Sequence, residues 1–205
     1  MKTSTKTLSL CIIAFSAVLN LLGGTVALAF RLPVYLDSFG TMFTAAVLGP
    51  AAGIIPGLIS GIISGCTSDV YAFFYIPVQM ILGLVCGLTL RRIRPFERNT
   101  LWKLFPLAAV VSIPATLVSA AITAEVFGGI TSSGSSVLVQ LFHTGGLPLT
   151  ASVFLVQFLT DYLDRIIILA AVLAALPLFH RMFPQMPLTA RLQGERNHQK
   201  KDGWK

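Results

Sequence analysis

The stretch GPAAGIIPGLISGIISG, residues 49–65, carries a glycine at every fourth position and is otherwise almost wholly apolar. In water it would be a poor helix, because each interior glycine costs about 0.5–1 kcal/mol relative to alanine. In a bilayer the backbone must satisfy its own hydrogen bonds, so the segment is still expected to be helical there. Residues four apart share one helix face, so the glycines predict a smooth surface against which a neighbouring helix packs closely.

The composition of the whole chain also indicates a membrane protein. Of its 205 residues 55% are hydrophobic and only 11% are charged, whereas a soluble domain carries about 25% charged residues. The formal net charge is +7, but Lys and Arg lie between apolar runs and in the tail. This distribution follows the positive-inside rule and argues against a nucleic-acid-binding face. We expect a multi-pass membrane protein.

The apolar runs predict the number of helices. The charge-free run 38–68 would be about 46 Å long as one helix, half as long again as the hydrocarbon core. Gly49-Pro50 in its middle predicts a break, because proline cannot continue the hydrogen-bond ladder and disfavours the α conformation of the residue before it. The predicted fold is an all-α integral membrane protein with six transmembrane helices, at about 8–30, 37–49, 51–66, 70–91, 104–126 and 150–180.

Basic residues predict the orientation. The segment 91–103 has five basic residues, more than any other loop between apolar runs, and should face the cytoplasm together with Lys2 and Lys6. An even number of helices must therefore precede it, as the break at Gly49-Pro50 provides. The basic tail 184–205 should also be cytoplasmic, so both termini are predicted inside.

Two domains of unequal character are expected. Residues 1–183 form the membrane domain, and residues 184–205 are expected to be disordered because they have little to bury. At the N-terminus, an apolar run followed by Ala27-Leu28-Ala29 is also compatible with a cleavable signal peptide. The uncharged run continues to Phe30, however, which is long enough for an uncleaved span.

A pair of opposite charges marks the last helix. Asp161 and Arg165 are four residues apart and can pair on one helix face near its expected outer end. Two interpretations stay open, an interfacial salt bridge that fixes the depth of the helix and a pair that faces a ligand.

Further polar residues fall near the expected outer ends of other helices. They can converge there on one outward-facing cavity, in which rings stack on a small, flat, polar ligand and carboxylates accept its hydrogen bonds. These residues are Tyr35, Asp37, Asp69, Tyr71, Glu125 and His143. Asp37 is also well placed to cap the helix 37–49, and Tyr71 and Tyr75 are also typical of an interfacial aromatic belt.

Deeper polar residues and the cysteines have structural roles in this interpretation. Asn20 and Gln79 are expected to form interhelical hydrogen bonds. The cysteines, which form no CxxC pair and have no nearby histidine, are expected to be small buried hydrophobic residues at Cys11, Cys66 and Cys86. The chain has no HExxH, P-loop or GxSxG motif, so we expect no enzyme activity, catalytic residue, metal or cofactor.

Two stretches resemble a known family. LPVYLDSFGTMFTAAVLGPAAGIIPGLISG at 32–61 and IPVQMILGLVCGL at 76–88 are similar to the substrate-binding S components of energy-coupling factor (ECF) transporters, above all to uncharacterised S components with an LPxYLDxxGT motif. The resemblance covers most of residues 8–180. It implies that the protein captures a vitamin or related micronutrient outside the cell, and that a transmembrane scaffold protein and two ATPase subunits drive its release inside.

The resemblance also implies where ligand and partner bind. Family ligands are held by the outer halves of the last three helices and their loops, which on depth and topology selects Tyr71, Tyr75, Gln79, Glu125, His143, Gln157, Asp161 and Arg165. His143 alone in a loop is also compatible with a solvated histidine. The first helix of the family docks on the scaffold through Ala-x-x-x-Ala, for which the corresponding residues here are Ala14, Ala17 and Val18, with valine in place of the second alanine.

The expected function is therefore that of an S component, and two other classes stay open. A stand-alone carrier coupled to protons or sodium would use Asp161, Asp164 and Glu125 as coupling groups. A membrane sensor without a transport role is the second alternative. The nutrient itself is not identified, because similar folds read different ligands.

The orientation gives a first prediction. In a variant whose native cysteines are replaced, a single cysteine placed within 91–103 should react with a membrane-impermeant maleimide only from the cytoplasmic side. A single cysteine within 127–149 serves as the control and should react from outside. Labelling of the 91–103 cysteine in intact cells would refute the predicted topology.

Overall fold

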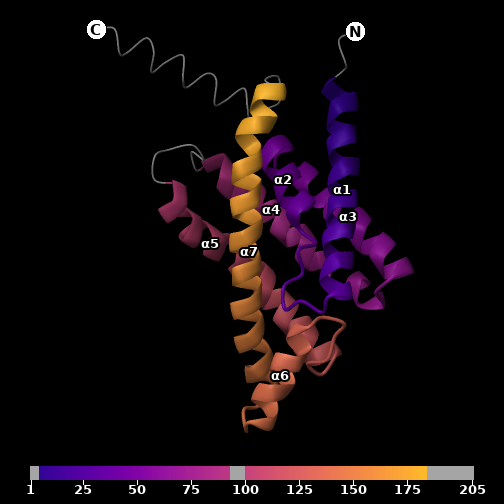
Figure 1. Ribbon diagram of the computed structural model, residues 1–205, viewed down its shortest axis with the longest axis vertical. Helices are drawn as coiled ribbons and strands as arrows, with labels where there is room; N and C mark the ends of the chain where they lie inside the picture. Colours follow the sequence, from indigo (N-terminus) through magenta and orange to yellow (C-terminus); the bar gives the residue numbers. More distant parts are fainter. Residues whose placement is uncertain (1–4, 93–99, 184–205) are drawn as a thin grey trace.

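The computed structural model describes residues 5–92 and 100–183 (Figure 1). These residues form seven α-helices, and no strand occurs among them. The helices are α1 (Thr5–Ala29), α2 (Phe39–Leu48), α3 (Pro50–Thr67), α4 (Ile76–Arg92), α5 (Thr100–Ala121), α6 (Ser135–Thr144) and α7 (Leu149–Met182). A 3₁₀ turn, η1 (Val70–Phe73), precedes α4, and a π-helical turn, η2 (Ile122–Val126), continues α5. The tail 184–205 lies outside the described residues.

Four helical segments are long and apolar enough to cross a membrane, namely Thr5–Ala29, Pro50–Thr67, Trp102–Val126 and Leu149–Met182. Large apolar side chains cover their outer faces, as at Phe15 and Trp102, which are 62% and 81% exposed. In water such surface would be unfavourable. These features suggest a multi-pass membrane protein. The start of α1 and the end of α7 lie at the same end of the molecule (Figure 1), as an even number of passes requires.

The predicted break at Gly49-Pro50 is confirmed. Helix α2 ends at Leu48 and α3 begins at Pro50. Gly49 between them has φ +103°, a conformation that favours glycine. An added Cβ there would lie 2.1 Å from Nη2 of Arg91, so the last turn of α4 lies directly against this turn.

The glycine face of α3 lies at a close helix contact, as its period predicted. Gly53 packs on Ala45 of α2, and Gly57 packs on Gln79 of α4. The neighbouring helix contributes a glycine of its own, because a Cβ on Gly83 would lie 2.6 Å from the carbonyl oxygen of Gly53. Glycine on both sides lets the backbones of α3 and α4 approach each other.

Several expected helix boundaries differ from the structure. The helix expected at 70–91 is divided into η1 and α4, and Pro77, which has no N–H to donate, lies in the first turn of α4. The region 127–149 contains α6. Helix α7 has 34 residues, about 51 Å at 1.5 Å per residue. It therefore extends beyond the rest of the bundle, and α6 packs on the projecting part (Figure 1).

The cysteines only partly occupy the buried positions expected of them. Cys86 is buried in the core, whereas Cys11 and Cys66 are exposed on the surface of α1 and α3. Cysteine is apolar enough for a position facing lipid, so an apolar stretch alone does not determine whether its cysteine faces the core.

The feature that shapes the site is the start of α2 inside the bundle. After α1 ends, residues 30–38 fold back along it without forming a helix. The carbonyl of Leu36 lies against Gly23, and Gly40 lies against the carbonyl of Ser16. Helix α2 therefore begins beside the middle of α1 rather than at its outer end.

Glycine packing gives a second prediction, in which two Gly→Ala changes should differ in their effect on the stability of the protein. Alanine normally stabilises a helix by about 0.5–1 kcal/mol over glycine. Gly83→Ala should nevertheless destabilise the protein by about 1–3 kcal/mol, because its methyl group meets the backbone of α3. In the control Gly24→Ala, the nearest atom, Cβ of Asp37, is 3.4 Å away, and stability should be unchanged or higher. Melting in detergent measures both, and equal melting temperatures would contradict the close contact.

Candidate functional site

A cavity lies where the segment 30–38 meets α1, α3, α4 and α7. Its volume is about 80 Å³. A cavity needs about 10–15 Å³ to hold one water, so this one holds several waters or a small organic group. Its polar lining residues are Asn20, Tyr35, Asp37, Ser60, Ser64, Asp69, Tyr75, Gln79, Ser119, Thr131, Ser132, Asp161 and Arg165. Leu21, Leu28 and Val78 are among the apolar residues of its wall.

Asn20 of α1 holds the beginning of α2. Its Oδ1 accepts hydrogen bonds from the backbone N–H groups of Gly40 (2.7 Å) and Thr41 (3.3 Å), and its Nδ2 donates to the hydroxyls of Thr41 (2.8 Å) and Ser60 (3.4 Å). The first N–H groups of a helix have no partner within it, so Asn20 supplies the cap from another helix. The possible capping role of Asp37 is not observed, since the N-cap residue is Ser38 and no side chain of α2 itself forms a cap hydrogen bond.

Gln79 connects the same region to α4. Its Oε1 accepts from the Thr41 hydroxyl (3.3 Å), and its Nε2 donates to the backbone carbonyl of Asp37 (3.4 Å). The interhelical hydrogen bonds expected of Asn20 and Gln79 are therefore confirmed.

The ion pair of α7 differs from the one expected. Arg165 donates from Nη1 to Oδ2 of its neighbour Asp164 and to the Ser38 hydroxyl (2.7 Å), rather than pairing with Asp161. Asp164 also accepts the N–H of Leu36 at 3.0 Å. Leu36 has φ +53°, which is unfavourable for a leucine, and this hydrogen bond helps to hold it. Asp164 faces the folded-back segment, whereas Asp161 faces α5, where its Oδ2 accepts from the Thr116 hydroxyl (2.9 Å).

These charged groups point into the bundle. Asp161, Asp164 and Arg165 are only 3%, 1% and 5% exposed, as ionisable groups in a membrane-spanning helix require. Of the five N–H donors of Arg165, the described residues supply acceptors only to Nη1, and its Nε is buried without a partner.

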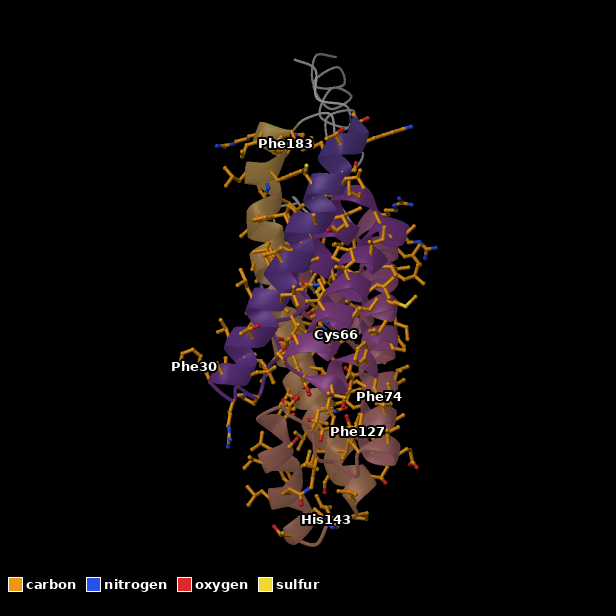
Figure 2. All side chains as sticks on the ribbon, turned by 90° about the vertical axis from the view of Figure 1, so that its right-hand side faces the viewer. Phe30, Cys66, Phe74, Phe127, His143 and Phe183 are labelled. Atoms are coloured by element: carbon orange, nitrogen blue, oxygen red, sulfur yellow. The ribbon has the colours of Figure 1, made fainter. Side chains whose placement is uncertain are left out.

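A second polar cluster positions Tyr75. Its hydroxyl bonds to the Thr123 hydroxyl (2.5 Å), which also accepts from Nε2 of Gln157 (2.6 Å). Thr123 lies in the π-helical turn η2, and such turns occur frequently at functional sites. Phe127 lies beside Phe74 (Figure 2) with ring centroids 5.1 Å apart, and it also contacts the Tyr75 ring. The Tyr75 side chain is thus held in the cavity wall.

Hydrogen bonds between loops lie at the rim of the cavity. The Ser132 hydroxyl donates to Oδ2 of Asp69 (2.6 Å), and Oδ1 of Asp69 accepts the N–H of Tyr71 (3.2 Å). Gly134 packs directly on the carbonyl of Arg31. The loop before α6, the loop after α1 and the turn before η1 therefore meet at one point.

Four of the eight predicted ligand residues line the cavity, namely Tyr75, Gln79, Asp161 and Arg165. The other four do not. Gln157 is buried behind Thr123, and Tyr71 packs on Phe127 at 4.7 Å between ring centroids. Glu125 is exposed, and His143 lies at the far end of α6 with Nδ1 2.9 Å from the Leu147 carbonyl (Figure 2). Depth and topology therefore selected four side chains that line the cavity and four that do not.

The convergence suggested for the outer loops is observed for half of its residues. Tyr35, Asp37 and Asp69 line the cavity, whereas Tyr71, Glu125 and His143 do not. Asn20, Ser60 and Ser64 were not among the predicted ligand residues. Each is a polar residue in an otherwise apolar run, which is the signal that identifies them.

The predicted docking residues of α1 do not share one face. Ala14 and Val18 are exposed, whereas Ala17 is buried at 3% exposure and packs inside the bundle. Ala14 and Val18 are four residues apart and lie on the same helix face, whereas Ala17 is rotated away from that face. Ala17 is therefore not accessible to a partner protein in this structure.

No protein-family model, curated protein or solved structure matches this chain. Within residues 5–92 and 100–183, no group of three His, Cys, Asp or Glu side chains is arranged to hold a metal ion. What the cavity offers is a set of carboxylates, an arginine, amides and tyrosine rings enclosed in an apolar bundle. Such a pocket can bind a small polar organic molecule.

The Asn20 cap gives a third prediction. Asn20→Leu leaves the N–H groups of Gly40 and Thr41 without an acceptor and should destabilise the protein by about 1–3 kcal/mol. The control is Thr25→Val on the same helix, which removes an exposed hydroxyl bonded only to the Leu21 carbonyl of its own helix. Its melting temperature in detergent should be close to that of the wild type. A melting temperature of Asn20→Leu as high as that of the control would contradict the capping role.

Proposed function

We propose that the protein is the substrate-binding S component of an ECF-type importer in the bacterial plasma membrane. It captures a small organic micronutrient from outside and passes it to an ATP-driven partner module. The observation that carries the proposal is the polar cavity, in which ionisable side chains are buried within an apolar helical bundle. Ionisable groups in such positions are costly and mark substrate or ion pathways.

The position of the sequence motif supports the same function. Five residues of LPVYLDSFGT, namely Tyr35, Asp37, Ser38, Gly40 and Thr41, line the cavity or bond to residues that line it. The stretch on which the family resemblance rests is therefore the stretch that builds the site. This correspondence favours a shared ligand-binding role over similarity in hydropathy alone.

In this proposal the partner scaffold docks on the outer face of α1. Ala14 and Val18 lie one turn apart on that face, and Leu22, 57% exposed, continues it by another turn. A small residue at Ala14 lets a partner helix approach closely. The family contact expected at Ala17 has no counterpart in this arrangement.

A stand-alone carrier coupled to protons or sodium is the second candidate. The burial of Asp161 and Asp164 favours it, because intramembrane carboxylates are typical coupling groups. Glu125, the third expected coupling group, is exposed and does not line the cavity.

Reconstitution distinguishes the two candidates and gives a fourth prediction. The protein is placed in proteoliposomes with or without an ECF scaffold and its two ATPases, and uptake of the small molecule that co-purifies with it is measured by mass spectrometry. Uptake should require all partners and ATP. A module whose ATPases cannot hydrolyse ATP is the matched control and should show none. Uptake by this chain alone under a proton or sodium gradient would overturn the proposal in favour of the carrier.

A further inference from the structure

We infer that the ligand of this cavity carries a positive charge, which Asp37 and Asp161 bind. This inference rests on the proposed function, because it takes the cavity as the place where the nutrient binds. It adds the chemical class of the nutrient, an organic cation such as a protonated amine, an amidinium or a positively charged ring.

The balance of charge around the cavity is the first argument. Three carboxylates line it, those of Asp37, Asp69 and Asp161, against one cationic side chain among the described lining residues, Arg165. Arg165 is paired with Asp164, and its single charge also acts on Asp37 and Asp161, so one arginine is set against three carboxylates. None of the three lining carboxylates has an ion-pair partner in the described part of the chain.

The hydrogen bonds show which carboxylates are open to a ligand. Asp69 lies at the rim, where each of its two oxygens accepts a hydrogen bond. Asp161 is buried and lines the cavity; its Oδ2 accepts from Thr116, and its Oδ1 has no partner among the described residues. Asp37 lines the same space beside Gln79, which donates to its backbone carbonyl. Asp161 therefore has one oxygen free to accept from a ligand, and Asp37 adds a second negative charge to the cavity wall.

Burial makes this capacity significant. A carboxylate removed from water without a compensating charge is strongly unfavourable, and an opposite charge nearby relieves the cost. A cationic ligand supplies that charge, whereas an anion adds repulsion from two carboxylates. The rings of Tyr35 and Tyr75 line the same cavity and can attract a cation through their faces.

Three flat probes of nearly the same shape test the inference. Benzamidine is positively charged at neutral pH, benzamide is neutral and benzoate is negatively charged. Each is titrated at millimolar concentration into the purified full chain in detergent, and the rise in melting temperature reports binding to the folded state. Benzamidine should raise the melting temperature in a concentration-dependent manner, and its apparent affinity should exceed that of the other two by at least about tenfold.

Variants locate the binding. Asp161→Asn and Asp37→Asn should each weaken benzamidine binding by about tenfold or more, because each removes a charge partner from the cavity wall with little change in shape. Glu125→Gln is the matched control, since it removes one negative charge from an exposed position outside the cavity, and its affinity should equal that of the wild type. Melting without probe reports folding, and if Asp161→Asn does not fold, Asp37→Asn decides.

Benzamide or benzoate binding as tightly as benzamidine would overturn the inference, as would an equal loss of affinity in Glu125→Gln. Its failure is distinguishable from failure of the proposed function. ATP-dependent uptake of a neutral or anionic co-purified molecule would retain the importer and reject the cation. Charge-selective binding that depends on Asp37 and Asp161, with uptake that needs no ATPase, would retain the cation and reject the importer.

Discussion

The backbone N–H groups at the start of α2 must be hydrogen-bonded inside the bundle, and the rest of the site depends on this requirement. A bilayer provides no water for them, so irregular backbone at depth is tolerated only where protein or a polar cavity satisfies it. Asn20 accepts from two of these groups, and Asp164 accepts from Leu36 just before them. Polar side chains are therefore brought to one place in an apolar bundle, and they enclose the cavity.

Close packing of α3 against its neighbours makes this arrangement possible. Gly57 of α3 packs against Gln79 of α4, and Gly83 of α4 packs against the backbone of α3. Helices α3 and α4 therefore both lie near α2. Ser60 and Gln79 can then reach Asn20 and Thr41. The glycine period was first an argument for tight packing, and in the structure the same packing brings together four helices that share one polar network.

Sequence reasoning succeeded where one local property decides the outcome. Length and Gly49-Pro50 predict the division between α2 and α3, and the need of buried amides for partners predicts the bonds of Asn20 and Gln79. It failed where distant segments decide. Nothing in the local sequence shows that residues 30–38 fold back along α1. Arg165 could pair with Asp161 or Asp164 of its own helix, and it pairs with Asp164, which also binds the folded-back segment. Glu125 likewise lies exposed in the π-helical turn, which hydropathy does not reveal.

We expect the cavity beside the start of α2 to hold the ligand. An experimental structure of the protein with the small molecule it retains on purification tests this most directly. We expect the molecule between α1, α4 and α7, within hydrogen-bonding distance of Asp161 and in contact with the Tyr75 ring. A molecule bound instead at the outer surface near Glu125 and His143, with the cavity closed by side chains, would contradict it.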